Sequence, residues 1–140
     1  MFQNLVNSPK DHPKIPKEKI GVILGNLGTP EATDYWSVRR YLKEFLSDRR
    51  VIDYSPWVWK PILSLILLRR PFSSGEAYRQ VWNNKKNESP LLTITRKQAK
   101  KLATLCKQEL GNHIVVDFCM RYGKPSTEKV IRKMKDQGCN

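Results

Sequence analysis

The sequence predicts a doubly wound α/β fold, in which helices cover both faces of a parallel sheet. Two apolar runs, at residues 20–24 and 114–120, have the composition of buried parallel strands. A glycine-containing bend follows each run, and the chain between them has helical periodicity. Because strands that are joined by helices are normally parallel, we expect the two runs to belong to one sheet.

The bend after the first strand, at residues 25–28, is the most informative segment. Gly25 and Gly28 permit a positive φ or a close approach of backbone, and open α/β sheets bind ligands at the carboxyl ends of their strands. The spacing of Gly21, Gly25 and Gly28 is not G-x-G-x-x-G, so the dinucleotide-binding fingerprint is absent. From spacing alone, an ordinary strand-to-helix turn is the simpler interpretation and a ligand-binding bend is the alternative.

Helical patterns occupy most of the remaining chain. Thr33 or Asp34 can cap the first helix, Pro61 suits an early turn of the second, and Ser89 begins the longest. A last helix starts at Ser126 or Thr127. The expected helices cover residues 34–48, 60–68, 74–82, 89–110 and 126–138.

The densest apolar run covers residues 57–68. Its 12 residues are too few to span a bilayer, which takes about 20. Its side chains surround the helix on nearly every side, so the helix is either wholly buried or partly in contact with lipid. Trp57 and Trp59 at one end and Arg69–Arg70 at the other favour membrane contact, whereas core burial is the simpler interpretation.

The net charge of +13 predicts an anionic partner, which can be nucleic acid, anionic lipid or a small substrate with carboxylates or phosphates. Three cysteines without a C-x-x-C pair indicate a reducing, cytoplasmic environment. His12 and His113 have no companions at ligand spacing, so we expect no metal site.

The chain divides into two expected regions. Residues 1–19 carry three prolines among lysines and have no signal-peptide apolar region, so we expect a flexible leader. Residues 20–140 form the α/β domain. Since two strands cannot make a stable parallel sheet with covered edges, we expect these residues to be the first part of a larger protein.

A set of short motifs resembles the N-terminal part of ferrochelatase, the enzyme that inserts ferrous iron into protoporphyrin IX in haem biosynthesis. The motifs are, in order, 26–31 (NLGTPE), 38–42 (VRRYL), 44–48 (EFLSD), 69–71 (RRP), 78–79 (YR), 88–91 (ESPL) and 121–125 (RYGKP). The resemblance extends from Gly21 to Gly138. It implies a chelatase-like fold of two similar doubly wound domains with the porphyrin between them, of which this chain supplies most of the first.

The resemblance assigns porphyrin-binding roles to matching positions. Leu27 matches the bend residue that faces the porphyrin centre, where a leucine can contact the ring but cannot ligate a metal. Arg70, Tyr78 and Ser89 match residues that hold the propionates, and their guanidinium and hydroxyl groups are suitable donors for carboxylates. Arg69 matches a neighbouring arginine on the same lip.

Two further groups follow from the same resemblance. Arg121 and Tyr122 match a pair that lines the metal side of the pocket. An apolar lip around the entrance is expected to touch the membrane; its members are Leu42, Phe45, Leu46, Ile62, Leu65 and Ile66. The resemblance therefore favours lipid contact over core burial for the run at 57–68. We expect a cytoplasmic protein that is peripheral on the inner face of the membrane.

The resemblance gives this chain no catalytic residue. The proton-abstracting histidine of the family and its acidic partner lie in the second half of the family sequence, and neither His12 nor His113 lies in a matching motif. Removal of pyrrole protons needs a positioned base, so we expect the chain alone to be inactive. In two departures, Gly25 replaces a usual leucine and Lys124 a usual asparagine.

The implied partners are a porphyrin, a membrane surface and the missing C-terminal half, with no nucleic acid. Ferrous iron and protoporphyrin IX are substrates and no cofactor is required, while the presence of an iron–sulfur cluster in the full protein stays open. One alternative is a non-catalytic truncated remnant. The other is a basic module that binds nucleic acid, which would interleave aromatic with basic residues, whereas Trp57, Trp59 and Phe72 cluster with aliphatic ones.

Overall fold

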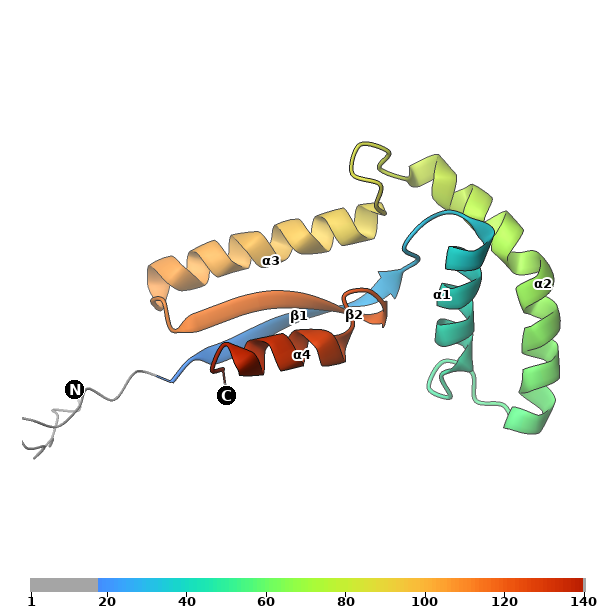
Figure 1. Cartoon of the computed structure of the whole chain (residues 1–140), viewed down its shortest axis with the longest axis horizontal. Helices are drawn as coiled ribbons and strands as arrows, with labels where there is room; N and C mark the ends of the chain where they lie inside the picture. Colours follow the sequence, from blue (N-terminus) through green and yellow to red (C-terminus); the bar gives the residue numbers. More distant parts are fainter. Residues whose placement is uncertain (1–17, 140) are drawn as a thin grey trace, which may run out of the picture.

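A computed structural model describes residues 18–139, so most of the expected leader at 1–19 lies outside the described part. The two predicted strands, β1 (Ile20–Thr29) and β2 (Ile114–Gly123), form a parallel two-stranded sheet. Helix α3 (Pro90–Glu109) lies on one face and α4 (Thr127–Asp136) on the other, as Figure 1 shows. The prediction of a parallel α/β architecture with helices on both faces is confirmed.

Both strands continue further than the sequence predicts. β1 runs through the expected bend at 25–28, and β2 extends to Gly123. The ends of the two strands approach each other so closely that only glycine, which has no Cβ, fits at two positions. Gly28 has a φ of 115°, and a Cβ there would overlap the carbonyl oxygen of Tyr122. Gly123 has a φ of 82°, and its Cβ would lie 2.7 Å from the carbonyl oxygen of Thr29.

Helices α1 (Tyr35–Ser47) and α2 (Pro56–Val81) pack against each other near the carboxyl ends of the strands (Figure 1). The expectation of separate helices at 60–68 and 74–82 is wrong, because α2 is continuous through Pro71. The proline removes one backbone hydrogen bond. A buried stripe at four-residue spacing nevertheless continues through it, and the helix, although bent in Figure 1, stays unbroken; the stripe is Leu63, Leu67, Pro71 and Gly75.

The core lies mainly between α4 and the sheet. Cys119 of β2 and Val130 and Met134 of α4 form a buried cluster, against which Ile23 of β1 and Cys139 pack. The buried positions Val130 and Met134 are four residues apart and occupy one face of α4. Ser126 caps this helix by accepting a hydrogen bond from the backbone N–H of Lys129. The packing places the carboxyl end of β2 next to α1.

Candidate functional site

The carboxyl ends of β1 and β2 lie beside α1, α2 and the first turns of α3 (Figure 1). Leu27 is 49% exposed at this end of the sheet. Asn26 fixes its position, because the Asn26 side chain accepts a hydrogen bond from the Leu27 N–H (2.8 Å) and donates one to Thr95 Oγ1 of α3 (2.9 Å). The predicted ring-contact residue is therefore exposed on a backbone that is tied to a helix.

Hydroxyl groups of α1, α2 and β1 gather behind the strand ends. The buried Tyr41 donates a hydrogen bond from its hydroxyl to the carbonyl oxygen of Gly28 (3.2 Å). Burial raises the pKa of Tyr41, and the nearby Tyr78 raises it further. Burial also raises the pKa of Tyr78, while the hydroxyls of Tyr41 and Thr29 partly offset that rise. Both phenols are thus neutral donors at physiological pH, and Tyr78 lies close to the end of β1.

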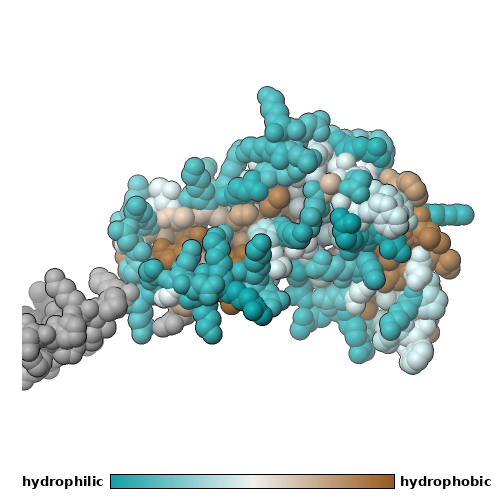
Figure 2. Space-filling model, viewed as in Figure 1, coloured by the Kyte–Doolittle hydropathy of each residue, from teal (hydrophilic) through white to brown (hydrophobic). Residues whose placement is uncertain are grey.

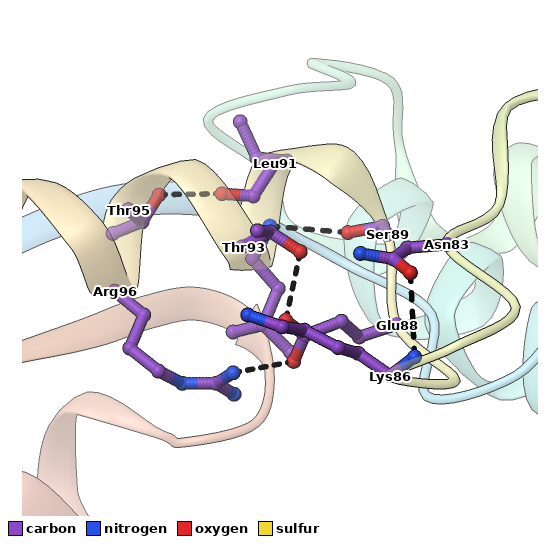
Figure 3. A network of polar contacts seen from close by, with 9 residues as sticks. Asn83, Lys86, Glu88, Ser89, Leu91, Thr93, Thr95 and Arg96 are labelled. Atoms are coloured by element: carbon purple, nitrogen blue, oxygen red, sulfur yellow. Dashed lines mark hydrogen bonds and ion pairs between the residues drawn. The ribbon is translucent and has the colours of Figure 1, made fainter.

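Ser89 begins α3, as the sequence predicts, and is 2% exposed. Its Oγ accepts a hydrogen bond from the N–H of Leu92 (3.2 Å), so the buried hydroxyl serves as the cap of α3. The preceding residue, Glu88, is buried and accepts hydrogen bonds from Thr93 Oγ1 (2.7 Å) and Arg96 Nη1 (2.6 Å), as Figure 3 shows. This network fixes the loop that leads into Ser89.

The charge of Glu88 is maintained by these donors. Burial raises the pKa of Glu88, but the hydrogen bonds from Thr93 and Arg96 and the charge of Arg96 outweigh it, so the pKa is lowered overall. The backbone N–H of Asn83 donates to the Glu88 carbonyl oxygen (2.9 Å), which closes the loop before α3. The entry to α3 is therefore anchored by both the backbone and the side chain of Glu88.

Arg121 and Tyr122 contact Asp48, the residue at the carboxyl end of α1. Asp48 Oδ2 accepts from Arg121 Nη2 (2.7 Å) and from the Tyr122 hydroxyl (2.9 Å). The backbone N–H of Arg50 and the two side-chain donors lower the pKa of Asp48 to about 2. Tyr122 is buried, and its ring packs against the ring of Phe45 in a T-shaped arrangement with centroids 5.2 Å apart. Asp48 and Tyr122, with Glu44, line an open hollow of about 570 Å³.

Arg69 and Arg70 are exposed on α2, with Arg70 about 12 Å along the helix from Tyr78. Within residues 18–139, no hydrogen bond or ion pair joins either guanidinium to another predicted site residue. The structure thus brings Leu27, Tyr78 and Tyr122 to one end of the sheet, and it leaves both arginines free in the surface of the adjoining helix.

The predicted lip residues are partly exposed. Ile62 and Leu65 of α2 are 42% and 68% exposed, whereas Ile66 and the α1 positions Leu42, Phe45 and Leu46 are half-buried. Figure 2 shows a hydrophobic region on the surface formed by α2 and another over the sheet between α3 and α4. Core burial of the apolar run is therefore incomplete, because only one stripe of α2 is covered. No helix of the described part of the chain is both long and apolar enough to cross a membrane.

The described residues contain no group of three or more histidine, cysteine or acidic side chains that could hold a metal ion. His113 lies at the amino end of the sheet, where its carbonyl oxygen accepts from the N–H of Ile20 (2.9 Å). That is the end opposite Tyr122, at a distance of about 30 Å along β2. His113 is therefore remote from the candidate site.

Four residues of the site are not identified by sequence reasoning. They are Asn26, Tyr41, Asp48 and Glu88. All four lie in the motifs quoted above, yet their partners are strand ends or a later helix. One signal could have found Asp48: an acidic residue at the carboxyl end of a helix opposes the helix dipole and so implies a partner elsewhere.

The chain matches the ferrochelatase family over residues 19–140. Curated relatives include the ferrochelatases of Rhodobacter capsulatus (58% identical over 137 residues), Chelativorans sp. strain BNC1 (50% over 137) and Agrobacterium fabrum (49% over 140). These matches cover 96%, 97% and 99% of this chain but only 39%, 38% and 40% of the relatives. The chain thus spans about two fifths of the length of its relatives, in a partial chelatase-like domain, and it belongs to the ferrochelatase family.

Proposed function

We propose that this chain forms one wall of a porphyrin-binding cleft in a ferrochelatase, which inserts ferrous iron into protoporphyrin IX during haem biosynthesis. One observation carries the proposal: tyrosine hydroxyls, a guanidinium and an exposed apolar residue, Leu27, share the carboxyl end of a parallel sheet. Parallel sheets bind ligands at this end. A porphyrin needs both apolar and polar contacts, because its ring is apolar and its two propionates are anionic.

The propionates are expected to bind Arg70, Tyr78 and Ser89. A guanidinium binds a carboxylate through two parallel N–H donors, and Arg70 has no carboxylate partner within residues 18–139 that would compete. Ser89 lies at the amino end of α3, where the helix dipole favours an anion. Arg69 adds positive charge on the same helix, and the net charge of +13 attracts an anionic substrate.

The ring is expected to contact Leu27, while Arg121 and Tyr122 line the metal side. Pyrrole deprotonation needs a positioned base. His113 lies about 30 Å from Tyr122 along β2, so it does not supply that base. The base and its acidic partner are expected from the part of the family sequence that this chain does not match. We accordingly expect no metal insertion by the 140-residue chain alone.

The exposed apolar side of α2 is expected to touch the membrane from the cytoplasmic face. Trp57 is 90% and Leu65 68% exposed, and apolar side chains flanked by arginines bind anionic lipid surfaces. This location would admit an apolar substrate directly from the bilayer. A peripheral position agrees with the finding that no described helix could span a membrane.

The proposal is tested with a hybrid in which residues 19–140 replace the matching part of the Rhodobacter capsulatus relative. Wild-type hybrid is expected to bind protoporphyrin IX and to incorporate zinc or ferrous iron, whereas the 140-residue chain is expected to show no turnover. Arg70→Ala and Ser89→Ala should weaken porphyrin binding, each by about tenfold, because a charge-assisted hydrogen bond is lost.

Arg132→Ala is the matched control, since Arg132 is an exposed arginine on α4, away from the site. It should change porphyrin affinity less than twofold. Unchanged affinity of both Arg70→Ala and Ser89→Ala would contradict the proposed site. Clear metal insertion by the isolated chain would contradict the assignment of the base to the unmatched part.

A further inference from the structure

We infer that Asp48 is a positioning residue of the porphyrin pocket. From the carboxyl end of α1, its carboxylate holds the Arg121 guanidinium and the Tyr122 hydroxyl in one arrangement. The inference rests on the proposed function, because it concerns the pair that lines the metal side of the pocket. The family resemblance gives Asp48 no role, so the inference is drawn from the contacts of Asp48 with β2.

The three side chains form a closed set of hydrogen bonds. Asp48 Oδ2 accepts from Arg121 Nη2 (2.7 Å) and from the Tyr122 hydroxyl (2.9 Å), while Arg121 Nε donates to the same hydroxyl (3.1 Å). The other Asp48 oxygen, Oδ1, accepts from the backbone N–H of Arg50 (2.8 Å). Each Asp48 oxygen is therefore engaged, and the carboxylate has little freedom to rotate.

The direction of each proton follows from this arrangement. A phenol has one proton, and that of Tyr122 is given to Asp48, so Tyr122 cannot donate to a ligand while Asp48 is ionised. Arg121 has five N–H donors, of which two are used within the set. Asp48 thus makes Arg121 the donor of the pair and Tyr122 an apolar wall, whose ring is fixed from behind by Phe45.

The position of Asp48 supports a role beyond local structure. A carboxylate at the carboxyl end of a helix lies near carbonyl oxygens and opposes the helix dipole, which disfavours it there. A polar neutral residue would satisfy the Arg50 N–H equally well. The contacts that need a charge are those with Arg121 and Tyr122 of β2, which lie 73 and 74 residues after Asp48 in the sequence.

The test is a double-mutant cycle of Asp48→Asn and Arg121→Ala, made in the 140-residue chain and in the hybrid. Protoporphyrin IX affinity is measured by fluorescence titration. Asp48→Asn should weaken binding about tenfold in the wild-type background and clearly less in Arg121→Ala, because the contact with Arg121 is already lost there and only the contact with Tyr122 remains. A purely structural role would give the same loss in both backgrounds.

Asp117→Asn is the matched control. The Asp117 side chain is 21% exposed, like that of Asp48, accepts from a backbone N–H at 2.8 Å and pairs with Lys133 at 2.7 Å. It should change affinity less than twofold. Tyr122→Phe, which keeps the packing on Phe45, is a second test that does not alter Asp48, and it should weaken binding by an intermediate factor.

The outcomes separate this inference from the proposed function. If Arg121→Ala weakens binding but Asp48→Asn does not, the positioning role is overturned and the site assignment stands. Equal losses from Asp48→Asn in both backgrounds also overturn the positioning role. If neither Arg121→Ala nor Arg70→Ala changes porphyrin affinity, the proposed site itself is overturned.

Discussion

Replacing Gly28 by alanine should prevent the strand ends from meeting. Gly28 has a φ of 115°, which L side chains rarely adopt, and a Cβ there would lie 2.8 Å from the carbonyl carbon of Tyr122. Backbone strain of this kind costs about 1–3 kcal/mol. Forcing an extra methyl group against packed atoms costs about another 1–3 kcal/mol. The free energy of unfolding should therefore fall by at least about 2 kcal/mol.

Gly25→Ala in the same strand is the matched control. A Cβ at Gly25 would have no atom within 4 Å, and its φ is not positive. Alanine should therefore be neutral or stabilise by about 0.5 kcal/mol. Urea and thermal unfolding followed by circular dichroism measure both variants, and Gly28→Ala should lower Tm by about 8 °C or more. Equal midpoints for the two variants would refute the close approach of β1 and β2.

Three further variants test other parts of the fold. Glu88→Gln should lower the free energy of unfolding by about 1–2 kcal/mol at pH 7, because Arg96 loses its charged partner. Since the pKa of Glu88 is lowered in the folded state, its contribution is complete above about pH 4.5 and is lost as the pH falls further, so the wild-type and Glu88→Gln urea midpoints should converge in acid. Asp34→Ala should cost about 1 kcal/mol, because the Asp34 carboxylate caps α1 by accepting two backbone N–H bonds; an unchanged urea midpoint would exclude that cap. Met134→Ala should cost about 2–5 kcal/mol, whereas Ile131→Ala, at a half-exposed position of the same helix, should cost less than about 1 kcal/mol; equal costs would contradict the orientation of α4.

The parts of the fold that depend on local pattern are predictable from the sequence. The two strands are apolar on both faces, so their pairing and their parallel direction follow from the helices between them. Ser89 is a good helix cap followed by Pro90, and α3 begins there. The continuity of α2 is not predictable in this way, because Pro71 is a local break signal and the buried stripe that overrides it depends on packing against α1.

The candidate site shows the same division. The sequence singles out Gly28 as part of an expected bend, whereas in the structure Gly28 lies inside β1 and the reason for the glycine is a carbonyl of Tyr122 on the other strand. Asp48 follows the last residue of α1 and has only a backbone N–H as a local partner, whereas its side-chain partners depend on the position of β2. Contacts between residues more than 70 positions apart require the three-dimensional arrangement, which local periodicity does not contain.

The central claim is that a porphyrin binds at the carboxyl end of this sheet. The most direct measurement is a titration of the ¹⁵N-labelled 140-residue chain with protoporphyrin IX, followed by amide chemical shifts. We expect the largest changes at Leu27, Tyr78, Ser89 and Tyr122, with little change along α4. Changes that are centred on the basic surface of α4, or no saturable change at all, would contradict the account.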